Sequence, residues 1–271
     1  MNANNNANLD SNIFYFDEVS STMDKAKEIL RDRANNNKDI FGIITGNQNN
    51  GRGTNGRVWK SGFNNLYMTA VFPLSKVPVP MTLIPLRIGT LIAPTIQSLL
   101  DSDASNLVQL KWPNDLLIDN KKVGGVLIEF ENNNVLVGIG CNIGSAPTVE
   151  TNGKNGGRKS TCLYDYKLRQ YNENNETNVK NVRNLIANSI MNSIMNWIEE
   201  GNDSSSLVIN EFQSLMTTSP QVIRKELNKD DNTGSIIGQS VIPLRLNSDG
   251  TLQVKLVENN KELSLITDYL F

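Results

Sequence analysis

The sequence predicts an α+β main domain followed by a small C-terminal β domain. Two observations lead to this prediction: apolar strands alternate with amphipathic helices over residues 13–218, and only short strands separated by turns follow Ser219-Pro220. A chain of 271 residues is long enough to bury a sizeable core. We therefore place the main domain at 13–218 and the β domain at 219–271, after an Asn-rich tail at 1–12 that we expect to be disordered.

Each element of the main domain follows from its local pattern. Short apolar, β-branched runs predict strands, and apolar residues spaced three or four apart predict helices. The hydroxyls at 20–22 suit an N-cap, and Pro94 should kink or split its helix. In chain order we expect a strand at 13–16, a helix that carries residues 23–30, a strand at 40–45, a glycine-rich loop at 46–62, a strand at 66–72 and a helix at 83–100. Strands at 107–111, 116–119, 123–131 and 135–140 follow, the last two forming a hairpin through 132–134.

The rest of the chain begins with a poorly patterned segment. Residues 145–178 are rich in Asn and Gly, so we expect a surface insertion there, interrupted at 160–163. Apolar spacing then predicts helices at 179–200 and 207–216. Short strands at 235–242, 244–247, 252–257 and 262–266 predict a small antiparallel barrel.

Composition excludes several functional classes. The chain has no histidine, which rules out Ser-His-Asp and Cys-His catalysis and any His-ligated zinc. Cys141 and Cys162 are too few for a disulfide framework or a four-thiolate metal site, and we expect both to be buried packing residues.

Charge and hydropathy narrow the class further. A net charge of −2 argues against binding nucleic acid through a broad basic face. No apolar run approaches the roughly 18 residues that a membrane span needs, and residues 1–11 lack the basic and apolar stretches of a targeting signal. We expect a cytoplasmic protein with no membrane partner.

The strongest local anomaly is the glycine-rich stretch between Gln48 and Trp59. Its closely spaced glycines expose backbone N–H groups, and Arg52 and Arg57 add cationic forks that match carboxylate and phosphate. A solvated turn with surface ion pairs explains the same pattern equally well. No Gly-Lys-Ser/Thr closes the stretch, so it is not a Walker loop.

A second anomaly is the string Lys111-Trp112-Pro113-Asn114-Asp115, which places a cation, an amide and a carboxylate at a strand end. Alone, this string reads more simply as Asx-turn chemistry with a Lys that reaches water. Two smaller signals are Gly124-Gly125 within an apolar strand, which implies close approach of a backbone or a ligand, and Asn142 between two glycines.

Taken together and in this order, these segments resemble the biotin protein ligase family (biotin–acetyl-CoA-carboxylase ligases, or holocarboxylase synthetases). The resemblance covers about residues 13–145 strongly and the remainder by architecture. Its motifs are Ser21-Thr22-Met23, the stretch from Gly51 to Trp59, Lys111-Trp112-Pro113-Asn114-Asp115, the stretch from Lys122 to Glu129, and Gly138-Ile139-Gly140-Cys141-Asn142-Ile143-Gly144. It implies a mixed β-sheet with flanking helices, of the class II synthetase type, and an SH3-like C-terminal barrel.

The resemblance also implies an enzyme that forms a C–N bond in two steps, with ATP and biotin as substrates and Mg²⁺ as cofactor. Biotin is first activated to biotinyl-5′-AMP and then transferred to a lysine on a biotin carboxyl carrier domain of acetyl-CoA carboxylase or another carboxylase. Both steps can proceed by positioning anions and stabilising charge, so a site without histidine can perform them.

Site residues carried over from the resemblance fall into three groups. Lys111, Arg52 and Asp115 are the catalytic candidates, with Lys111 bridging biotin's carboxylate and the α-phosphate, and Asp115 hypothesised to orient or deprotonate the carrier lysine. Biotin contacts are implied for Ser21, Thr22, Met23, Gln48, Gly51, Arg52, Gly53, Thr54, Lys111, Gly124 and Gly125. Nucleotide contacts are implied for Arg52, Arg57, Trp59, Asn114 and Asn142, and no metal ligand is assigned.

The sequence departs from the family pattern at two positions. Many relatives carry Arg or Lys at the place of Thr54, so the adenylate is held less tightly here unless Arg57 compensates. Relatives often have Asn where this chain has Met23, which puts a polar contact there in doubt. The first motif begins near residue 20, which leaves no room for the DNA-binding domain of some relatives, and we expect a ligase without repressor function.

Other functions remain open. A lipoate or octanoyl-protein ligase would share the fold, but its Arg-Arg-x-Ser-Gly-Gly-Gly loop is absent. A non-catalytic biotin sensor would not need Lys111 and Arg52, and an interaction protein with a fortuitous glycine loop fits less well. The acceptor carboxylase and the oligomeric state are not predicted.

Overall fold

The computed structural model describes residues 12–32, 40–60, 62–149, 158–171, 173–223 and 238–266, so nearly all of the tail predicted at 1–12 lies outside it. The strands are β1 (Ile13–Val19), β2 (Phe41–Gln48), β3 (Leu66–Pro73), β4 (Val108–Lys111), β5 (Asp115–Ile118), β6 (Lys121–Glu131), β7 (Asn134–Cys141), β8 (Gln221–Val222), β9 (Ser240–Leu246), β10 (Leu252–Leu256) and β11 (Glu262–Leu265). The α-helices are α1 (Thr22–Asp32), α2 (Ile84–Leu99), α3 (Ser102–Ser105), α4 (Glu176–Glu200) and α5 (Ser205–Leu215). Within the described ranges, no helix is long and apolar enough to cross a membrane.

The main domain is built on one seven-stranded sheet with the order β1-β2-β3-β7-β6-β5-β4. The β1–β2 pair is parallel, and the other neighbours are antiparallel. The mixed sheet that we predicted is therefore confirmed. The predicted hairpin at 132–134 is also confirmed, because Asn132 and Asn133 adopt the left-handed backbone that its tight turn requires (φ 49° and 59°).

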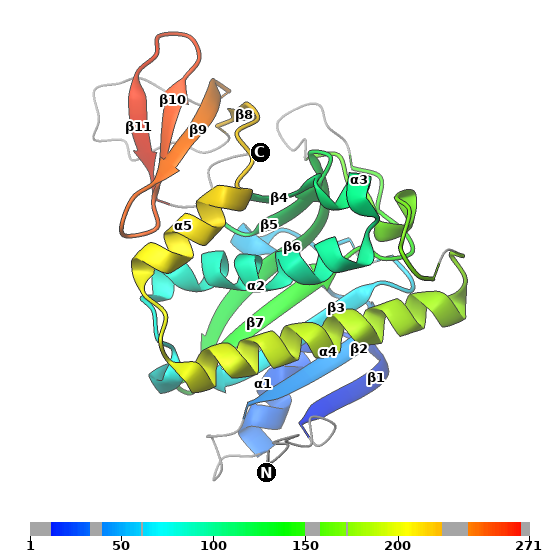
Figure 1. Cartoon of the computed structure of the whole chain (residues 1–271). Helices are drawn as coiled ribbons and strands as arrows, with labels where there is room; N and C mark the ends of the chain where they lie inside the picture. Colours follow the sequence, from blue (N-terminus) through cyan, green and yellow to red (C-terminus); the bar gives the residue numbers. More distant parts are fainter. Residues whose placement is uncertain are drawn as a thin grey trace, which may run out of the picture.

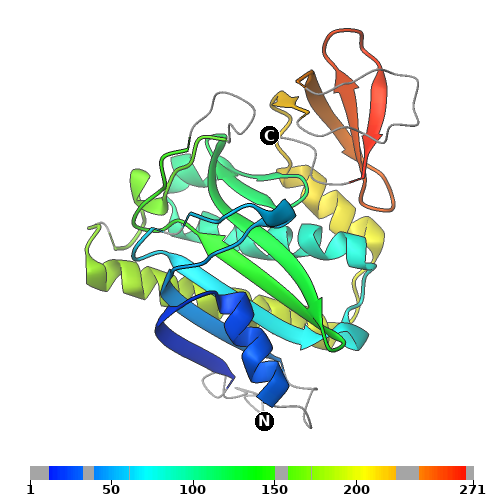
Figure 2. The same ribbon diagram turned by 180° about the vertical axis from the view of Figure 1, so that it is seen from behind.

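Helices cover both faces of this sheet. In Figure 1, α2 and α4 cross one face, and Figure 2 shows α1 on the opposite face. Helix α1 packs on β2, β3 and β7, whereas α2 packs on β4, β5 and β6. The larger core lies under α2 and α4, and a smaller cluster around Met23, Ala26 and Leu30 lies under α1.

We expected Pro94 to kink or split its helix, and the structure excludes the split. Helix α2 runs unbroken through this residue. The Pro94 ring is exposed, whereas Ala93 and Ile96 beside it are fully buried in the core. Packing of these neighbours outweighs the one backbone hydrogen bond that proline removes.

The C-terminal strands form a four-stranded antiparallel sheet with the order β11-β10-β9-β8. A single strand, β9, replaces the two strands that we predicted at 235–242 and 244–247. The SH3-like barrel stays a prediction, because residues 224–237 and 267–271 lie outside the described part of the chain. The indole Nε1 of Trp112 donates to the carbonyl of Gly250 at 2.9 Å, which ties this sheet to the main domain.

The segment predicted as a surface insertion at 145–178 also reaches the interior. Residues 150–157 lie outside the described ranges, but Leu163 is fully buried and Leu168 nearly so. Helix α4 begins within the segment, at Glu176, three residues before the predicted start. Part of this segment also borders the cavity described next.

Candidate active site

A cavity of about 670 Å³ lies beside the sheet. Its wall comes from the start of α1, the loop after β2, the strands β5, β6 and β7, and residues 147, 149, 158 and 160. Fourteen of the sixteen predicted site residues line it: Ser21, Thr22, Met23, Gln48, Arg52, Gly53, Thr54, Arg57, Trp59, Lys111, Asn114, Asp115, Gly125 and Asn142.

The other two predicted residues, Gly51 and Gly124, do not line the cavity. The Gly51 carbonyl accepts a hydrogen bond from Trp59 N at 3.0 Å, which closes the base of the loop. A Cβ at Gly124 would lie 2.9 Å from the Gly140 carbonyl oxygen. Gly124 therefore allows close packing of β6 on β7, and its predicted contact with biotin stays a prediction.

Hydroxyl and amide groups gather at one end of the cavity. Thr22 is held by Thr69, whose hydroxyl donates to Thr22 Oγ1 at 2.9 Å. The backbone N–H of Thr22 donates to Gln48 Oε1 at 3.4 Å, so the first turn of α1 and the end of β2 share this corner. Apolar residues Met23, Leu127 and Ile139 line the wall beside it.

Arg52 is fastened by two carboxylates. Its Nε and Nη2 donate to Glu129 at 2.7 and 3.1 Å, and its Nη1 lies 2.8 Å from Asp24. Nη1 also donates to Ser21 Oγ at 3.2 Å. The hydrogen bonds from Arg52, acting against burial and together with Lys27, lower the pKa of Glu129 to about 2.

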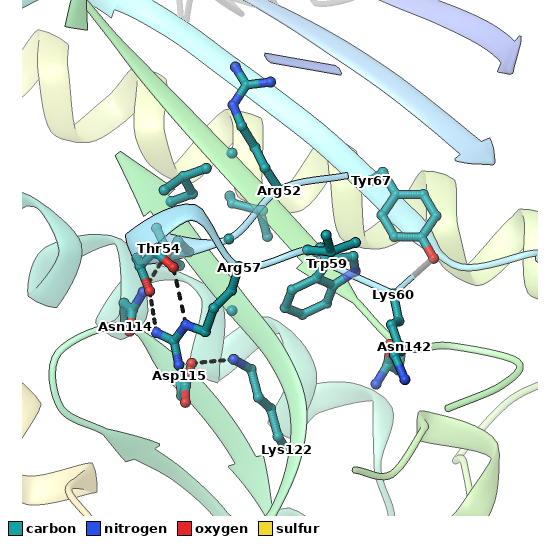
Figure 3. Close-up of a pocket in the computed structure, with 18 of the residues that line it drawn as sticks. Arg52, Thr54, Arg57, Trp59, Lys60, Tyr67, Asn114, Asp115, Lys122 and Asn142 are labelled. Atoms are coloured by element: carbon teal, nitrogen blue, oxygen red, sulfur yellow. Dashed lines mark hydrogen bonds and ion pairs between the residues drawn. The ribbon is translucent and has the colours of Figure 1, made fainter. Parts of the chain in front are cut away.

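These contacts make Arg52 the anchor of the glycine loop in this structure. Figure 3 shows its guanidinium directed away from Arg57, Asp115 and Lys122. The phosphate contact that we predicted for Arg52 requires it to leave Glu129 and Asp24, and that contact stays a prediction.

Lys111 and Asp115 lie deep in the cavity. The Lys111 side chain is 3% exposed, and its Nζ lies 3.5 Å from Asp115 Oδ2. Lys122 Nζ lies closer, 2.6 Å from Asp115 Oδ1. Burial by itself raises the pKa of Asp115, but the charges of Lys122 and Lys111 outweigh it and lower this pKa to about 2. Asp115 is therefore an ionised group that fixes two ammonium groups and is a poor proton acceptor.

Arg57 bends back onto Thr54. Its Nε donates to the Thr54 carbonyl at 3.1 Å, and its Nη2 donates to the Thr54 hydroxyl, as Figure 3 shows. A permanent cation therefore lies against Thr54.

The indole of Trp59 packs on β6 and β7 at two glycines, Gly125 and Gly140, which have no side chain beneath the ring. A Cβ at Gly140 would come within 2.7 Å of the indole, and one at Gly125 within 3.1 Å. Lys122 Nζ lies 5.2 Å from the centre of the Trp59 ring. The two glycines thus form a flat seat for the indole in the cavity wall.

Asn142 follows the end of β7 and lines the cavity. Its Nδ2 donates to the Thr161 carbonyl at 3.0 Å, whereas its buried Oδ1 has no hydrogen-bond partner among the described residues. The neighbouring turn is held by Asn65, whose Oδ1 accepts from the backbone N–H groups of Ile143 and Gly144 at 2.8 and 3.1 Å. Asn142 therefore offers a rigidly held acceptor to a ligand.

The structure also brings to the cavity residues to which the sequence gave no role. They are Val58, Lys60, Tyr67, Lys122, Val126, Leu127, Gly138, Ile139, Gly140, Pro147, Val149, Arg158 and Ser160. Lys122 lies within a matched motif, and the Lys at the start of an apolar strand was a signal for it. Arg158 lies next to residues of low complexity and carried no such signal.

The lining is strongly cationic. Among the described residues, it contains six basic residues, Arg52, Arg57, Lys60, Lys111, Lys122 and Arg158, but a single carboxylate, Asp115. Such a site attracts a polyanion. The other end of the cavity, where hydroxyl and amide groups lie beside apolar side chains, can hold a compact organic ligand next to that polyanion.

Known proteins match this chain in sequence and in structure. The model of the Biotin/lipoate A/B protein ligase family matches residues 15–145. The bifunctional ligase/repressor BirA of Bacillus subtilis is 31% identical over 149 residues, which cover 51% of this chain and 42% of that protein. BirA of Escherichia coli is 30% identical over 131 residues, or 46% of this chain and 40% of that protein. The chain thus spans about two-fifths of the length of these curated relatives.

Solved structures extend the likeness over nearly the whole chain. Biotin protein ligase from Leishmania major, in complex with biotinyl-5-AMP, is 28% identical with a TM-score of 0.60, covering 94% of this chain and 98% of that one. Biotin protein ligase from Aquifex aeolicus, in complex with biotin and ATP, shares the fold with a TM-score of 0.65 at 21% identity, over 96% and 97% of the two chains. Residues 15–145 match the model of the biotin/lipoate A/B protein ligase family, and the sequence motifs, the fold and the cationic cavity agree with that match.

Proposed function

We propose that this protein activates biotin with ATP to biotinyl-5′-AMP and then transfers biotin to a lysine of a carboxylase carrier domain. The observation that carries the proposal is the buried Lys111 ammonium, which lies in a cation-rich cavity with a polar and apolar compartment beside it. The Leishmania relative, whose structure holds biotinyl-5-AMP, supports the same ligand here.

Lys111 makes the first step possible by relieving repulsion between two anions. A carboxylate oxygen of biotin attacks the α-phosphorus, the bond from that phosphorus to the oxygen bridging to the β-phosphate breaks, and pyrophosphate leaves. Both reacting groups carry negative charge, so a fixed ammonium between them lowers the barrier in a site of low dielectric. Asp115 holds Lys111 in place through the ion pair described above.

Biotin occupies the compartment at the start of α1. Ser21, Thr22 and Gln48 supply hydrogen-bonding groups for its polar ring, and Met23 and Leu127 contact its apolar part. Met23 Sδ would lie 2.9 Å from a Cβ at Gly138, so its thioether already fills this side of the wall. Met23 therefore contributes an apolar contact in place of the amide of many relatives.

The nucleotide occupies the compartment of Trp59 and Asn142. The indole offers a flat surface for stacking, and the unpaired Asn142 Oδ1 suits an exocyclic amine of the base. Mg²⁺ enters with ATP, because Mg²⁺ in such sites is held largely by substrate phosphates. Among the described residues, no group of three or more acidic, Cys or His side chains is placed to hold a metal.

The decisive experiment supplies labelled biotin, Mg-ATP and a biotin carrier domain. We expect label on one carrier lysine, together with biotin-dependent exchange between ATP and pyrophosphate. Labelled lipoate in place of biotin tests the alternative function of a lipoate-protein ligase and should give no labelled carrier. Absence of exchange with a folded protein that still binds biotin would favour the sensor over the ligase.

Asp115 should help the transfer step without taking a proton. With a pKa of about 2 it stays ionised, whereas the incoming lysine has a pKa of about 10.4. The transfer rate from preformed biotinyl-AMP should therefore rise about tenfold per pH unit between pH 6 and 9, as the lysine loses its proton to water. Asp115→Asn should lower the rate about tenfold at every pH, as for loss of one charged hydrogen bond.

The control for this series is Asp119→Asn, because Asp119 forms an exposed pair with Lys121. It should leave the rate unchanged. If the wild-type transfer rate reached a plateau with rising pH and this plateau disappeared in Asp115→Asn, Asp115 would be a general base. An unchanged transfer rate in Asp115→Asn would show that Asp115 has no role in this step.

Thr54 has no positive charge to hold the adenylate, and we expect Arg57 to supply that charge. Arg57→Ala removes the cation bound to Thr54, and we expect release of labelled biotinyl-AMP to accelerate about tenfold, as for loss of one charged hydrogen bond. Thr54→Arg in the Arg57→Ala background should restore slow release. Release rates that stay equal in all three proteins would contradict the compensation.

A further inference from the structure

Arg158 reaches the cavity from a segment outside the family match, which ends at residue 145. Residues 159–161 run beside the start of β6: the N–H of Lys122 donates to the Lys159 carbonyl at 2.8 Å, and the N–H of Thr161 donates to the Lys122 carbonyl at 2.9 Å. Two backbone hydrogen bonds therefore hold this segment against Lys122. They place Arg158 at the cavity wall near the ion pair of Lys122 and Asp115.

The Arg158 guanidinium is only partly satisfied. Its Nη1 donates to the Asn120 carbonyl at 2.9 Å. Its Nε is buried and has no hydrogen-bond partner among the described residues. Burial lowers the pKa of Arg158, and the charge of Asp115 opposes that effect. Arg158 is half-buried, but its buried Nε–H lacks an acceptor within the described part of the chain, and an unpaired buried donor is costly for folding, which points to a ligand that supplies the missing acceptor.

The charge around Asp115 indicates which ligand this is. Four cations act on this carboxylate: Lys122 at 2.6 Å, Lys111 at 3.5 Å, and Arg57 and Arg158 at longer range. In the proposed function, Lys111 serves biotin's carboxylate and the α-phosphate, and Arg57 serves the adenylate. Lys122 and Arg158 are the two other cations of this group, and the substrate anion to which no cation has yet been assigned is the β- and γ-phosphates of ATP.

We propose that Arg158, together with Lys122, binds the β- and γ-phosphates of ATP and the pyrophosphate that leaves. This inference rests on the proposed function and adds to it a binding residue that comes from the segment after residue 145. The Arg158 Nε–H donates to a phosphate oxygen, and Asp115 keeps Lys122 directed at the same group. Arg158 is thus a substrate-binding residue for the leaving group and does not contact biotin.

The test compares Arg158→Gln with Lys159→Ala in direct binding by calorimetry. Gln keeps a polar stem and removes the charge, and Lys159 is an exposed cation on the same segment. For Arg158→Gln we expect affinities for pyrophosphate and ATP to fall about tenfold, as for loss of one charged hydrogen bond, with affinities for AMP and biotin unchanged. Lys159→Ala should match the wild type, and Arg158→Lys should recover part of the loss.

The outcomes separate this inference from the proposed function. Unchanged pyrophosphate affinity in folded Arg158→Gln overturns the inference, even if biotin-dependent exchange is intact. An equal loss in Lys159→Ala, or an equal loss for AMP, also overturns it, because the effect would then be general surface charge or a contact to the nucleoside. A third outcome is that Arg158→Gln loses pyrophosphate affinity but the wild-type protein shows no biotin-dependent exchange. The inference would then stand, and the proposed ligase function would fail.

Discussion

Lys111→Ala is expected to lower biotin-dependent ATP–pyrophosphate exchange about 1000-fold, the upper end of the effect of removing one preorganised electrostatic contact. The Lys111 side chain is 3% exposed, so a cation from solvent cannot replace its ammonium group between the two reacting anions. Biotin affinity should change little, since Ser21, Thr22 and Gln48 remain. The exchange rate is measured by incorporation of labelled pyrophosphate into ATP, and the biotin affinity is measured by calorimetry.

The Lys111 variant should fold, because Asp115 keeps its closer partner Lys122 at 2.6 Å. Lys121→Ala is the matched control: Lys121 lies in an exposed pair with Asp119, and such pairs contribute little to stability or function. Exchange in Lys111→Ala above a tenth of the wild-type rate would refute the bridging role. A loss of biotin affinity equal to the loss of exchange would instead make Lys111 a ground-state contact.

Much of the site was predictable because its residues lie next to strongly patterned strands. The glycine loop follows β2, and Lys111 and Asp115 lie at facing ends of β4 and β5, paired in register. Once the strands are recognised, sheet formation brings these motifs together. The hairpin at 132–134 was equally readable, since two asparagines in succession favour the left-handed turn that it needs.

The remainder depends on contacts between distant residues that leave no local pattern. Nothing in the sequence pairs Arg52 with Glu129, 77 residues later, so its role as the loop anchor was not foreseen. Arg158 likewise reaches the cavity only because its segment binds the backbone of Lys122. Pro94 misled us because its helix is stabilised by packing, which outweighs the local preference of the backbone.

Gly140→Ala is expected to have the second largest effect, a loss of about 100-fold in ATP affinity. Its Cβ would lie 2.7 Å from the Trp59 indole, a clash that the ring can relieve only by leaving its seat. Overpacking of this kind costs about 1–3 kcal/mol, which corresponds to about 5- to 150-fold in affinity. Gly125→Ala, with its nearest indole atom at 3.1 Å, should lose less. Calorimetry with ATP and with biotin measures both losses, and biotin affinity should change little.

The decisive variant is the double substitution Gly140→Ala with Trp59→Ala. If the glycine acts only by seating the indole, then removing the indole also removes the clash, and the double variant should bind ATP as Trp59→Ala alone does. Additive losses would mean that Gly140 acts on the sheet itself, for example through its carbonyl packed against Gly124. Non-additivity would establish that Gly140 on β7 is kept free of a side chain so that one aromatic ring can form the wall of the nucleotide compartment.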